Sequence, residues 1–229
     1  FVWRFIRWFH RPAQHIMVAT RSLKRELAEQ GLGQTMMWER GVDHALFHPG
    51  CPPHPDFAGL ARPIQLYVGR VAVEKNIEAF LETRHPGTKV IVGDGPALDE
   101  LRARFPDACF LGKLGGERLA GAYAGADVFV FPSRTDTFGL VVIEALSCGT
   151  PVAAYPVPGP ADIVTDDAGA LDTNLDRAIA LALTRDPGRA AALGRRYSWP
   201  NCTRQFLRAL TFVPAESAPS PATVSARLA

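Results

Sequence analysis

Two carboxylates, Asp136 and Glu144, flank a turn whose backbone could bind an anion. The turn Phe138-Gly139-Leu140 opens a segment with helical spacing, and the first N–H groups of a helix have no partner within it. Such groups bind phosphate, and Gly139 has no Cβ to keep a phosphate from the backbone. At about 1.5 Å per residue, Glu144 lies roughly 7 Å further along the helix than Gly139. One acid would therefore lie near the reactive side of the anion and the other about a ribose away. This spacing favours a nucleoside diphosphate that carries a sugar.

A strand, a helix and a second strand must position this turn. Residues 127–131 form a short apolar run, and residues 139–147 carry apolar side chains every three positions, the spacing of a helix face. Gly149 ends the helix, and residues 152–155 begin the next strand. A unit of this kind belongs to a parallel sheet, whose ligands bind where the strands end and the helices begin.

Two cations flank a second turn between a strand and a helix. Gly69 and Arg70 end a predicted strand at residues 64–68, and Lys75 precedes a helix that runs to residue 81. Both cations can lie over one diphosphate, which Arg grips with two N–H groups and Lys meets as a point charge. Two solvated surface cations are the alternative. Gly93 and Gly95, after a further strand, would give the same edge backbone freedom, as would any turn between a strand and a helix.

Three motifs together resemble retaining glycosyltransferases of family 4 (glycosyl transferases group 1). They are the two acids around Phe-Gly at residues 136–144, Gly-Arg…Glu-Lys at 69–75, and Arg-Gly-Val-Asp…Phe-His-Pro at 40–49. They occur in the order of the family, and the resemblance covers residues from about 20 to 210. The first acid is usually Glu in that family, whereas this chain has Asp136, which is one methylene shorter.

The alternation of strands and helices predicts an α/β fold, a Rossmann-like parallel sheet with helices on both faces. The resemblance identifies it as the C-terminal, donor-binding domain of the GT-B fold, with a remnant of the N-terminal domain. Because the chain begins without Met, in mid-element, we expect a fragment. The predicted division is the end of the N-terminal domain and the crossover at 1–50, a Pro-rich linker at 51–63, the nucleotide-sugar domain at 64–197, a return helix at 198–212 and a disordered tail at 213–229.

The resemblance implies transfer of a sugar, with retention, from a nucleoside-diphosphate sugar (GDP-mannose or a UDP-hexose) to an acceptor hydroxyl on a glycan or lipid. Asp136 would lie by the donor sugar, Arg70 and Lys75 at the pyrophosphate, and Glu144 at the ribose hydroxyls. The remaining donor-binding residues would be Gly69, Gly93, Gly95, Phe138, Gly139 and Leu140. No metal or other cofactor is expected. The missing N-terminal domain would hold the acceptor, so this chain alone is expected to be inactive.

Two other functions stay open, a nucleotide-binding module without catalysis and a nucleotide-sugar epimerase of the same two-domain plan. The net charge of +2 argues against a nucleic-acid partner. Reduced thiols and the lack of a long apolar run indicate the cytoplasm. Residues 1–11 are aromatic and basic, and predict either a helix that packs on the missing domain or a peripheral helix at the inner face of the membrane. The cysteines, which follow no metal or disulfide spacing, are Cys51, Cys109, Cys148 and Cys202.

Three further residues carry local predictions. Ser22 should cap a helix at residues 22–30. Gly41 should let the backbone come close to a donor, by the resemblance. Asp162 should be exposed on a helical turn at residues 161–164.

Overall fold

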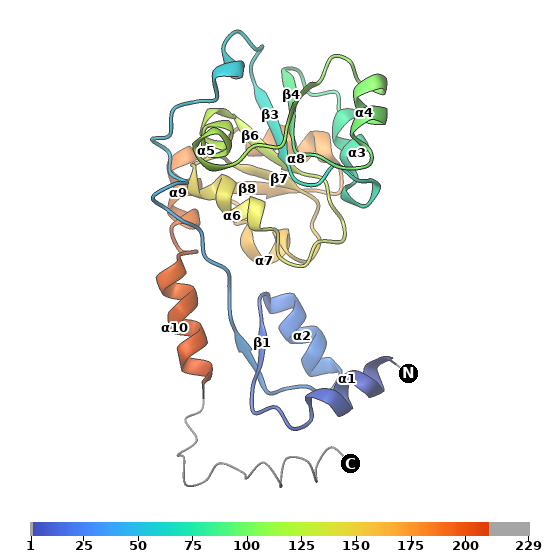
Figure 1. Ribbon diagram of the computed structural model, residues 1–229, viewed down its shortest axis with the longest axis vertical. Coiled ribbons are helices and arrows are strands. Elements are labelled where there is room, and N and C mark those ends of the chain that lie inside the picture. The colour runs from blue at the N-terminus through green and yellow to red at the C-terminus, as the bar shows by residue number, and fades with distance from the viewer. Residues whose placement is uncertain (1, 211–229) are drawn as a thin grey trace.

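The computed structural model describes residues 2–210 and contains a larger and a smaller unit (Figure 1). The larger unit is built on a six-stranded sheet in the order β5-β4-β3-β6-β7-β8, and all neighbouring strands are parallel. The strands are β3 (Ile64–Val68), β4 (Thr88–Val92), β5 (Cys109–Gly112), β6 (Val128–Phe131), β7 (Val152–Ala154) and β8 (Gly169–Leu171).

Helices cover both faces of this sheet because its strands are apolar on both sides. In β6, Val128 and Val130 belong to one buried cluster, whereas Phe129 and Phe131 belong to the other. α5 and α6 pack with the phenylalanines, and α3, α4 and α8 pack on the opposite face. Strands buried on both faces are typical of parallel sheets, and the predicted fold class is confirmed. The helices of this unit are η1 (Pro55–Phe57) and η2 (Val73–Lys75), both 3-10, α3 (Ile77–Leu81), α4 (Leu98–Arg104), α5 (Gly116–Gly125), α6 (Leu140–Ser147), α7 (Pro160–Ile163), α8 (Leu175–Ala182) and α9 (Pro187–Gly194).

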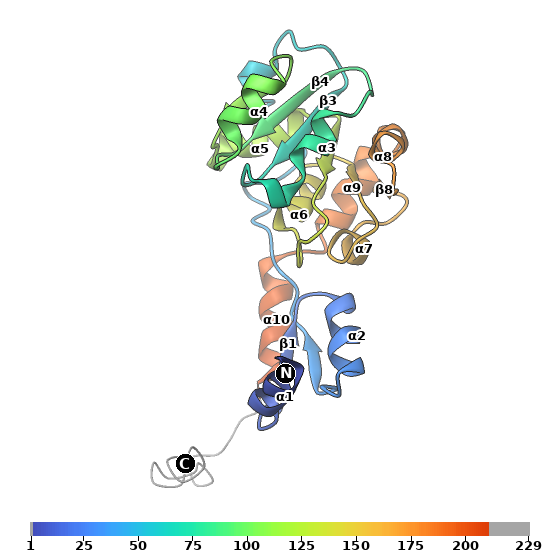
Figure 2. The same cartoon turned by 90° about the vertical axis from the view of Figure 1, so that its right-hand side faces the viewer.

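The smaller unit contains a two-stranded parallel sheet, and the last described helix lies beside it (Figure 1, Figure 2). The Trp38 and Phe206 ring centroids are 5.4 Å apart, and the backbone N–H of Glu39 donates to Gln205 Oε1 at 2.8 Å. The predicted disordered tail at 213–229 lies outside the described residues, and the predicted domain boundaries stay predictions. The elements here are α1 (Val2–His10), β1 (Ile16–Val18), α2 (Arg21–Glu29), β2 (Thr35–Met37) and α10 (Trp199–Ala209).

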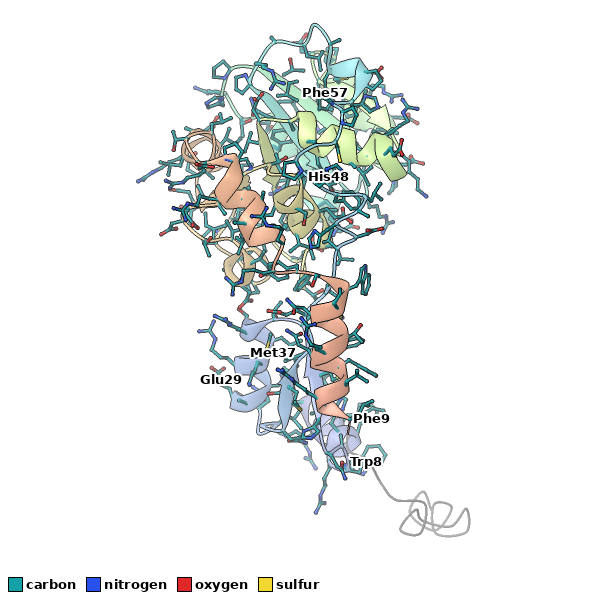
Figure 3. All side chains as sticks on the ribbon, turned by 90° about the vertical axis from the view of Figure 1, so that its left-hand side faces the viewer. Trp8, Phe9, Glu29, Met37, His48 and Phe57 are labelled. Carbon is teal, nitrogen blue, oxygen red and sulfur yellow. The ribbon has the colours of Figure 1, made fainter. Side chains whose placement is uncertain are left out.

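The outward face of α1 is apolar. Phe5, Trp8 and Phe9 are each more than half exposed, whereas Trp3 and Ile6 pack against the small core of their unit. Trp8 and Phe9 lie at the end of this unit furthest from the six-stranded sheet (Figure 3). The exposed face fits both predictions for this helix, a missing domain and a membrane surface. Within residues 2–210, no helix combines the length and the apolar character needed to cross a bilayer.

A carboxylate of the larger unit helps to begin α2 in the smaller one. The N-cap of α2 is Thr20, not the predicted Ser22, and its hydroxyl accepts from the N–H of Leu23 at 3.2 Å. The N–H of Ser22 instead donates to Oδ1 of Asp162 on α7, at 3.1 Å. Asp162 was predicted to be exposed, but it is half-buried at this contact between the two units.

The strand order reverses between β3 and β6, which lie side by side in the middle of the sheet. The chain moves from β3 to β4 and β5 on one side, and from β6 to β7 and β8 on the other. In open parallel sheets a crevice forms beyond the carboxyl ends of strands at such a reversal. Arg70 and Lys75 follow β3, and Asp136 and Gly139 follow β6, so the topology brings both predicted turns to this crevice.

Candidate functional site

Two adjoining cavities follow the carboxyl ends of β3, β4 and β6. The first, of about 700 Å³, is lined by the loops after β3 and β6, and also by Ala19 and Arg40, which follow β1 and β2. The second, of about 470 Å³, shares Val68, Gly69 and Arg70 with the first and extends to Lys113. Ligand sites in proteins have volumes of this size. The predicted site residues that line one or both cavities are Gly69, Arg70, Lys75, Gly93, Gly95, Asp136, Phe138, Gly139 and Leu140.

Lys75 and Asp136 are in direct contact inside the first cavity. The ammonium nitrogen lies 2.8 Å from each carboxylate oxygen. The sequence placed these residues at different ends of a donor, the pyrophosphate and the sugar, and gave no sign that they touch. A phosphate that bound Lys75 would have to share its ammonium group with Asp136 or displace the carboxylate.

Asn76 holds the two loops of this ion pair together, a role that the sequence analysis missed. Its side-chain Nδ2 donates to the carbonyl of Pro132, which follows β6, at 3.1 Å. Asn76 adopts a left-handed backbone with φ of 55°, a conformation that Asn tolerates better than most residues. An Asn directly before a predicted helix is compatible with a left-handed turn, so the sequence could have indicated the turn at Asn76. It could not have indicated the contact with Pro132.

Arg70 lines both cavities and makes a loose ion pair. Its NH1 lies 3.4 Å from Oε1 of Glu74, and both side chains are largely exposed. The carbonyl of Arg70 accepts from the hydroxyl of Tyr67 at 2.9 Å. Burial raises the pKa of Tyr67, and the carboxylates of Asp136 and Glu74 raise it further, so the hydroxyl stays a donor at neutral pH. The backbone at Arg70 is thus anchored while its guanidinium group is free to reorient.

Glu144 is not among the lining residues of either cavity, unlike the other predicted site residues. It lies half-buried on α6, and the hydroxyl of Tyr123 on α5 donates to its Oε2 at 2.8 Å. Burial raises the pKa of Glu144, and the hydrogen bond from Tyr123 opposes that rise. Tyr123 is fully buried and its own pKa is raised by burial and by Glu144, so it remains protonated. Nothing in the sequence around Tyr123 indicated this role.

The N-terminus of α6 faces the first cavity. Gly139 is its N-cap with φ of +83°, a conformation that favours glycine, and no side chain caps this end. Leu140 and Val141, the first two helical residues, line the cavity. Their backbone N–H groups belong to the unpaired set at a helix start, so this end can bind an anion.

The glycines of the neighbouring loops are also needed for packing. A Cβ on Gly93 would lie 1.8 Å from the carbonyl oxygen of Gly69, so the loops after β3 and β4 meet backbone to backbone. Gly41 lines neither cavity, and its predicted approach to a donor stays a prediction. A Cβ there would lie 2.6 Å from the N of Trp199, so its lack of a side chain lets the crossover pack on the start of α10.

In the part of the chain that the structure describes, no three His, Cys, Asp or Glu side chains come together as a metal site. In the first cavity the carboxylates Glu74 and Asp136 each contact a cation instead, and in the second Asp94 accepts from the N–H of Gly95. The charge available to an anionic ligand in this crevice comes from Arg70, Lys75 and Lys113, together with Arg40 and the start of α6.

Comparison with known proteins agrees with this architecture. The chain is 35% identical over 179 residues to the sulfoquinovosyl transferase SQD2 of Arabidopsis thaliana, a match of 72% of this chain and 35% of that protein. It is 37% identical over 176 residues to a GDP-mannose-dependent alpha-mannosyltransferase of Corynebacterium glutamicum, covering 74% of this chain and 42% of the relative. It therefore spans well under half the length of these curated relatives.

A solved sucrose-phosphate synthase from Thermosynechococcus elongatus superimposes with a TM-score of 0.72 at 27% identity, covering 90% of this chain and 60% of that one. The family model described as glycosyl transferases group 1 matches residues 62–185, which is more than half of the chain and contains both predicted turns. The chain therefore belongs to the glycosyl transferases group 1 family.

Proposed function

We propose that this chain is the donor-binding part of a glycosyltransferase that moves a sugar from a nucleoside-diphosphate sugar to an acceptor hydroxyl, with retention. The observation that carries the proposal is the meeting of Arg70, Lys75 and the start of α6 around one cavity at the reversal of the sheet. Three sources of positive charge at one point suit a diphosphate. The family of the chain supports the same reaction class.

The diphosphate would lie between the loop after β3 and the start of α6. The N–H groups of Leu140 and Val141 and the side chains of Arg70 and Lys75 bind its oxygens. The same groups stabilise the charge that develops on the leaving nucleoside diphosphate when the bond to the sugar breaks. The N–H groups of Leu140 and Val141 are fixed by the fold before the ligand arrives and need little reorganisation. The side chains of Arg70 and Lys75 instead turn from Glu74 and Asp136 toward the diphosphate.

The nucleoside would extend along the second cavity toward Gly93, Gly95 and Lys113. The resemblance to the family assigns Glu144 to the ribose hydroxyls, although it lines neither cavity and already accepts from the hydroxyl of Tyr123. Asp136 lies next to the donor sugar and sets the position of Lys75 at the same time. GDP-mannose is favoured because several relatives, such as the Corynebacterium enzyme, are GDP-mannose-dependent mannosyltransferases, and a UDP-hexose is the second candidate donor.

We expect this chain by itself to bind a nucleotide without transferring sugar. It spans 35% and 42% of the two relatives described above, and retaining transfer needs an acceptor held across a closed cleft. The test is calorimetric titration of the 229-residue chain with UDP, GDP and ADP, followed by a transfer assay with radiolabelled UDP-glucose and GDP-mannose. Saturable binding of UDP or GDP supports the proposal. A folded chain that binds none of the three nucleotides would contradict it, and robust turnover would show that one domain carries a complete site.

A further inference from the structure

Arg40 lies on a different part of the chain from the other cations of the first cavity. It lies after β2, on the crossover that joins the smaller unit to the larger one, whereas Arg70 and Lys75 follow β3. Arg40 and Ala19 are nevertheless lining residues of the same cavity of about 700 Å³. The cavity therefore has a basic group on the side of the smaller unit, apart from the groups assigned to the diphosphate.

Arg40 also differs in its charge partners. Lys75 is paired with Asp136, and Arg70 lies near Glu74. No carboxylate of residues 2–210 comes within 4.0 Å of the nitrogens of Arg40. The lining residues thus carry three cations against two carboxylates, and Arg40 supplies the charge that has no counterpart.

The guanidinium group of Arg40 is held in place although no acid holds it. Its NH1 donates to the carbonyl of Trp38 at 3.2 Å, and its central carbon lies 4.8 Å from the centroid of the Trp38 ring. Arginine has five N–H donors in a rigid plane, and the bond to Trp38 uses one of them. A stacked and oriented guanidinium group with free donors is suited to a planar or tetrahedral anion, which it can bind with two hydrogen bonds.

We propose that Arg40 binds an anionic group on the substrate beyond the diphosphate, a carboxylate, sulfonate or phosphate carried by the transferred sugar or by the acceptor. This rests on the proposed function and narrows it to an acidic substrate. The diphosphate already has Arg70, Lys75 and the start of α6. Because the nucleoside is assigned to the second cavity, the sugar end of the donor and an incoming acceptor would lie in the first, where an anion on either one would meet Arg40.

The test uses the whole 229-residue chain in calorimetric titrations. UDP alone is the reference for the donor site. UDP-glucose and UDP-glucuronic acid then differ by one carboxylate on the sugar, and GDP-mannose and GDP-mannuronic acid replace them if GDP binds better. For the acceptor source, the chain saturated with UDP or GDP is titrated with glycerol and with glycerol 3-phosphate. The variants are Arg40→Met and Arg40→Lys, and Arg21→Met is the matched control because Arg21 lies in the smaller unit outside the cavity.

We expect the acidic member of one pair to bind roughly tenfold to a hundredfold more tightly, as for a charged hydrogen-bonded contact. Preference for the acidic sugar identifies the donor as the source, and binding of glycerol 3-phosphate identifies the acceptor. Arg40→Met should remove the preference, Arg40→Lys should keep part of it and Arg21→Met should keep all of it, with unchanged circular dichroism spectra.

Two results would overturn the inference and leave the proposed function standing. If neither pair shows a preference while UDP or GDP binds, Arg40 only packs on Trp38. If Arg40→Met weakens UDP or GDP itself as much as the acidic ligand, Arg40 is a further diphosphate ligand. A folded chain that binds neither UDP nor GDP would instead remove the proposed function, and this inference with it.

Discussion

The ammonium group of Lys75 lies 2.8 Å from both carboxylate oxygens of Asp136, and this contact joins the loops after β3 and β6 across the reversal of the sheet. The two side chains are 26% and 22% exposed, so the ion pair is only partly screened by water. The bond from Asn76 to the carbonyl of Pro132 fixes the same two loops. Together they set the width of the cavity at the place assigned to the donor, so changes to either partner of the ion pair should affect binding and catalysis differently.

Lys75→Met should weaken the binding of UDP or GDP by roughly 1.5–3 kcal/mol, the value of a lost hydrogen bond to a charged group. Asp136 would also lose its partner and repel the diphosphate. Calorimetry on the 229-residue chain measures the effect. Lys24→Met, an exposed lysine on α2, is the matched control and should bind as the unaltered chain does. Equal affinities for all three proteins would remove Lys75 from the site.

Asp136→Asn should leave nucleoside-diphosphate affinity intact or slightly increase it, because the ammonium group of Lys75 no longer has a competing carboxylate. Transfer by the whole enzyme should fall, since the proposed place of Asp136 is beside the donor sugar. Parallel titrations of the chain and turnover assays of the whole enzyme separate the two effects. Asp136→Glu is the informative control, because it keeps the negative charge and introduces the longer acid that is usual in the family. Loss of nucleotide binding in Asp136→Asn, with binding intact in Glu144→Gln, would reverse the assignment of the two acids.

The fold and the outline of the site could be predicted because both depend on local patterns. The continuous apolar runs at β3 and β6 indicated buried parallel strands, and the motifs after them placed most of the cavity residues at one edge. β8 gave no such signal, because it contains only Gly169, Ala170 and Leu171 and no β-branched side chain.

Contacts between distant elements could not be predicted from those patterns. The hydrogen bond of Tyr123 to Glu144 depends on how α5 packs against α6, and the entry of Arg40 into the cavity depends on how the two units meet. Asp162 was misjudged for the same reason, since its exposure on α7 is decided by the position of α2. In each case the partner is set by tertiary packing and not by spacing along the chain.

Nucleotide binding should weaken as the pH falls through the pKa of Glu144, because the ionised carboxylate accepts both ribose hydroxyls and the protonated acid does not. Burial raises this pKa above its ordinary value of 4.5, and the hydrogen bond from Tyr123 lowers it. Tyr123→Phe removes only the lowering contribution, so the pKa should rise and the loss of affinity should begin at a higher pH than in the unaltered chain.

Titrations with UDP and GDP from acidic to neutral pH measure this shift. Tyr197→Phe is the matched control, a second buried tyrosine that lines neither cavity, and its profile should match that of the unaltered chain. Glu144→Gln should give a weaker affinity without the titration of residue 144, so that only the ionisation of the terminal phosphate, with a pKa of about 6, still changes it with pH. A Tyr123→Phe profile that coincides with the unaltered one would mean that Tyr123 does not shift the pKa of Glu144. A Glu144→Gln affinity equal to that of the unaltered chain would mean that Glu144 does not contact the ligand.

Asp162→Ala should loosen the contact between the two units. It removes the acceptor of the Ser22 N–H at the start of α2, and losing such a partner costs about 1 kcal/mol. Hydrogen exchange at the first amides of α2 should become faster. Asp166→Ala, an exposed acid nearby in the chain, should leave the exchange unchanged. If these amides exchange at the same rate in both variants, Asp162 does not hold the two units together.

Gly93→Ala should be severely destabilising, although it adds a single methyl group. The added Cβ would lie 1.8 Å from the carbonyl oxygen of Gly69, and Gly93 has a φ of +147° that other residues rarely adopt. Backbone hydrogen bonds fix both residues, since the N–H of Gly69 donates to the carbonyl of Val92 and the N–H of Gly93 donates to the carbonyl of Gly112. Rotation of a side chain therefore cannot relieve the clash, and we expect a loss of about 3 kcal/mol or more in the free energy of unfolding.

Urea unfolding of the two variants Gly93→Ala and Gly33→Ala tests this directly. Gly33 has no neighbour within 4 Å of a built Cβ and no positive φ, so its variant should unfold at nearly the same urea concentration as the unaltered chain. Whatever fraction of Gly93→Ala folds should also bind UDP or GDP less tightly, because Gly69 and Gly93 both line the second cavity and must move apart. A Gly93→Ala chain with the original midpoint and affinity would show that the loops after β3 and β4 do not need their close approach to form the donor site.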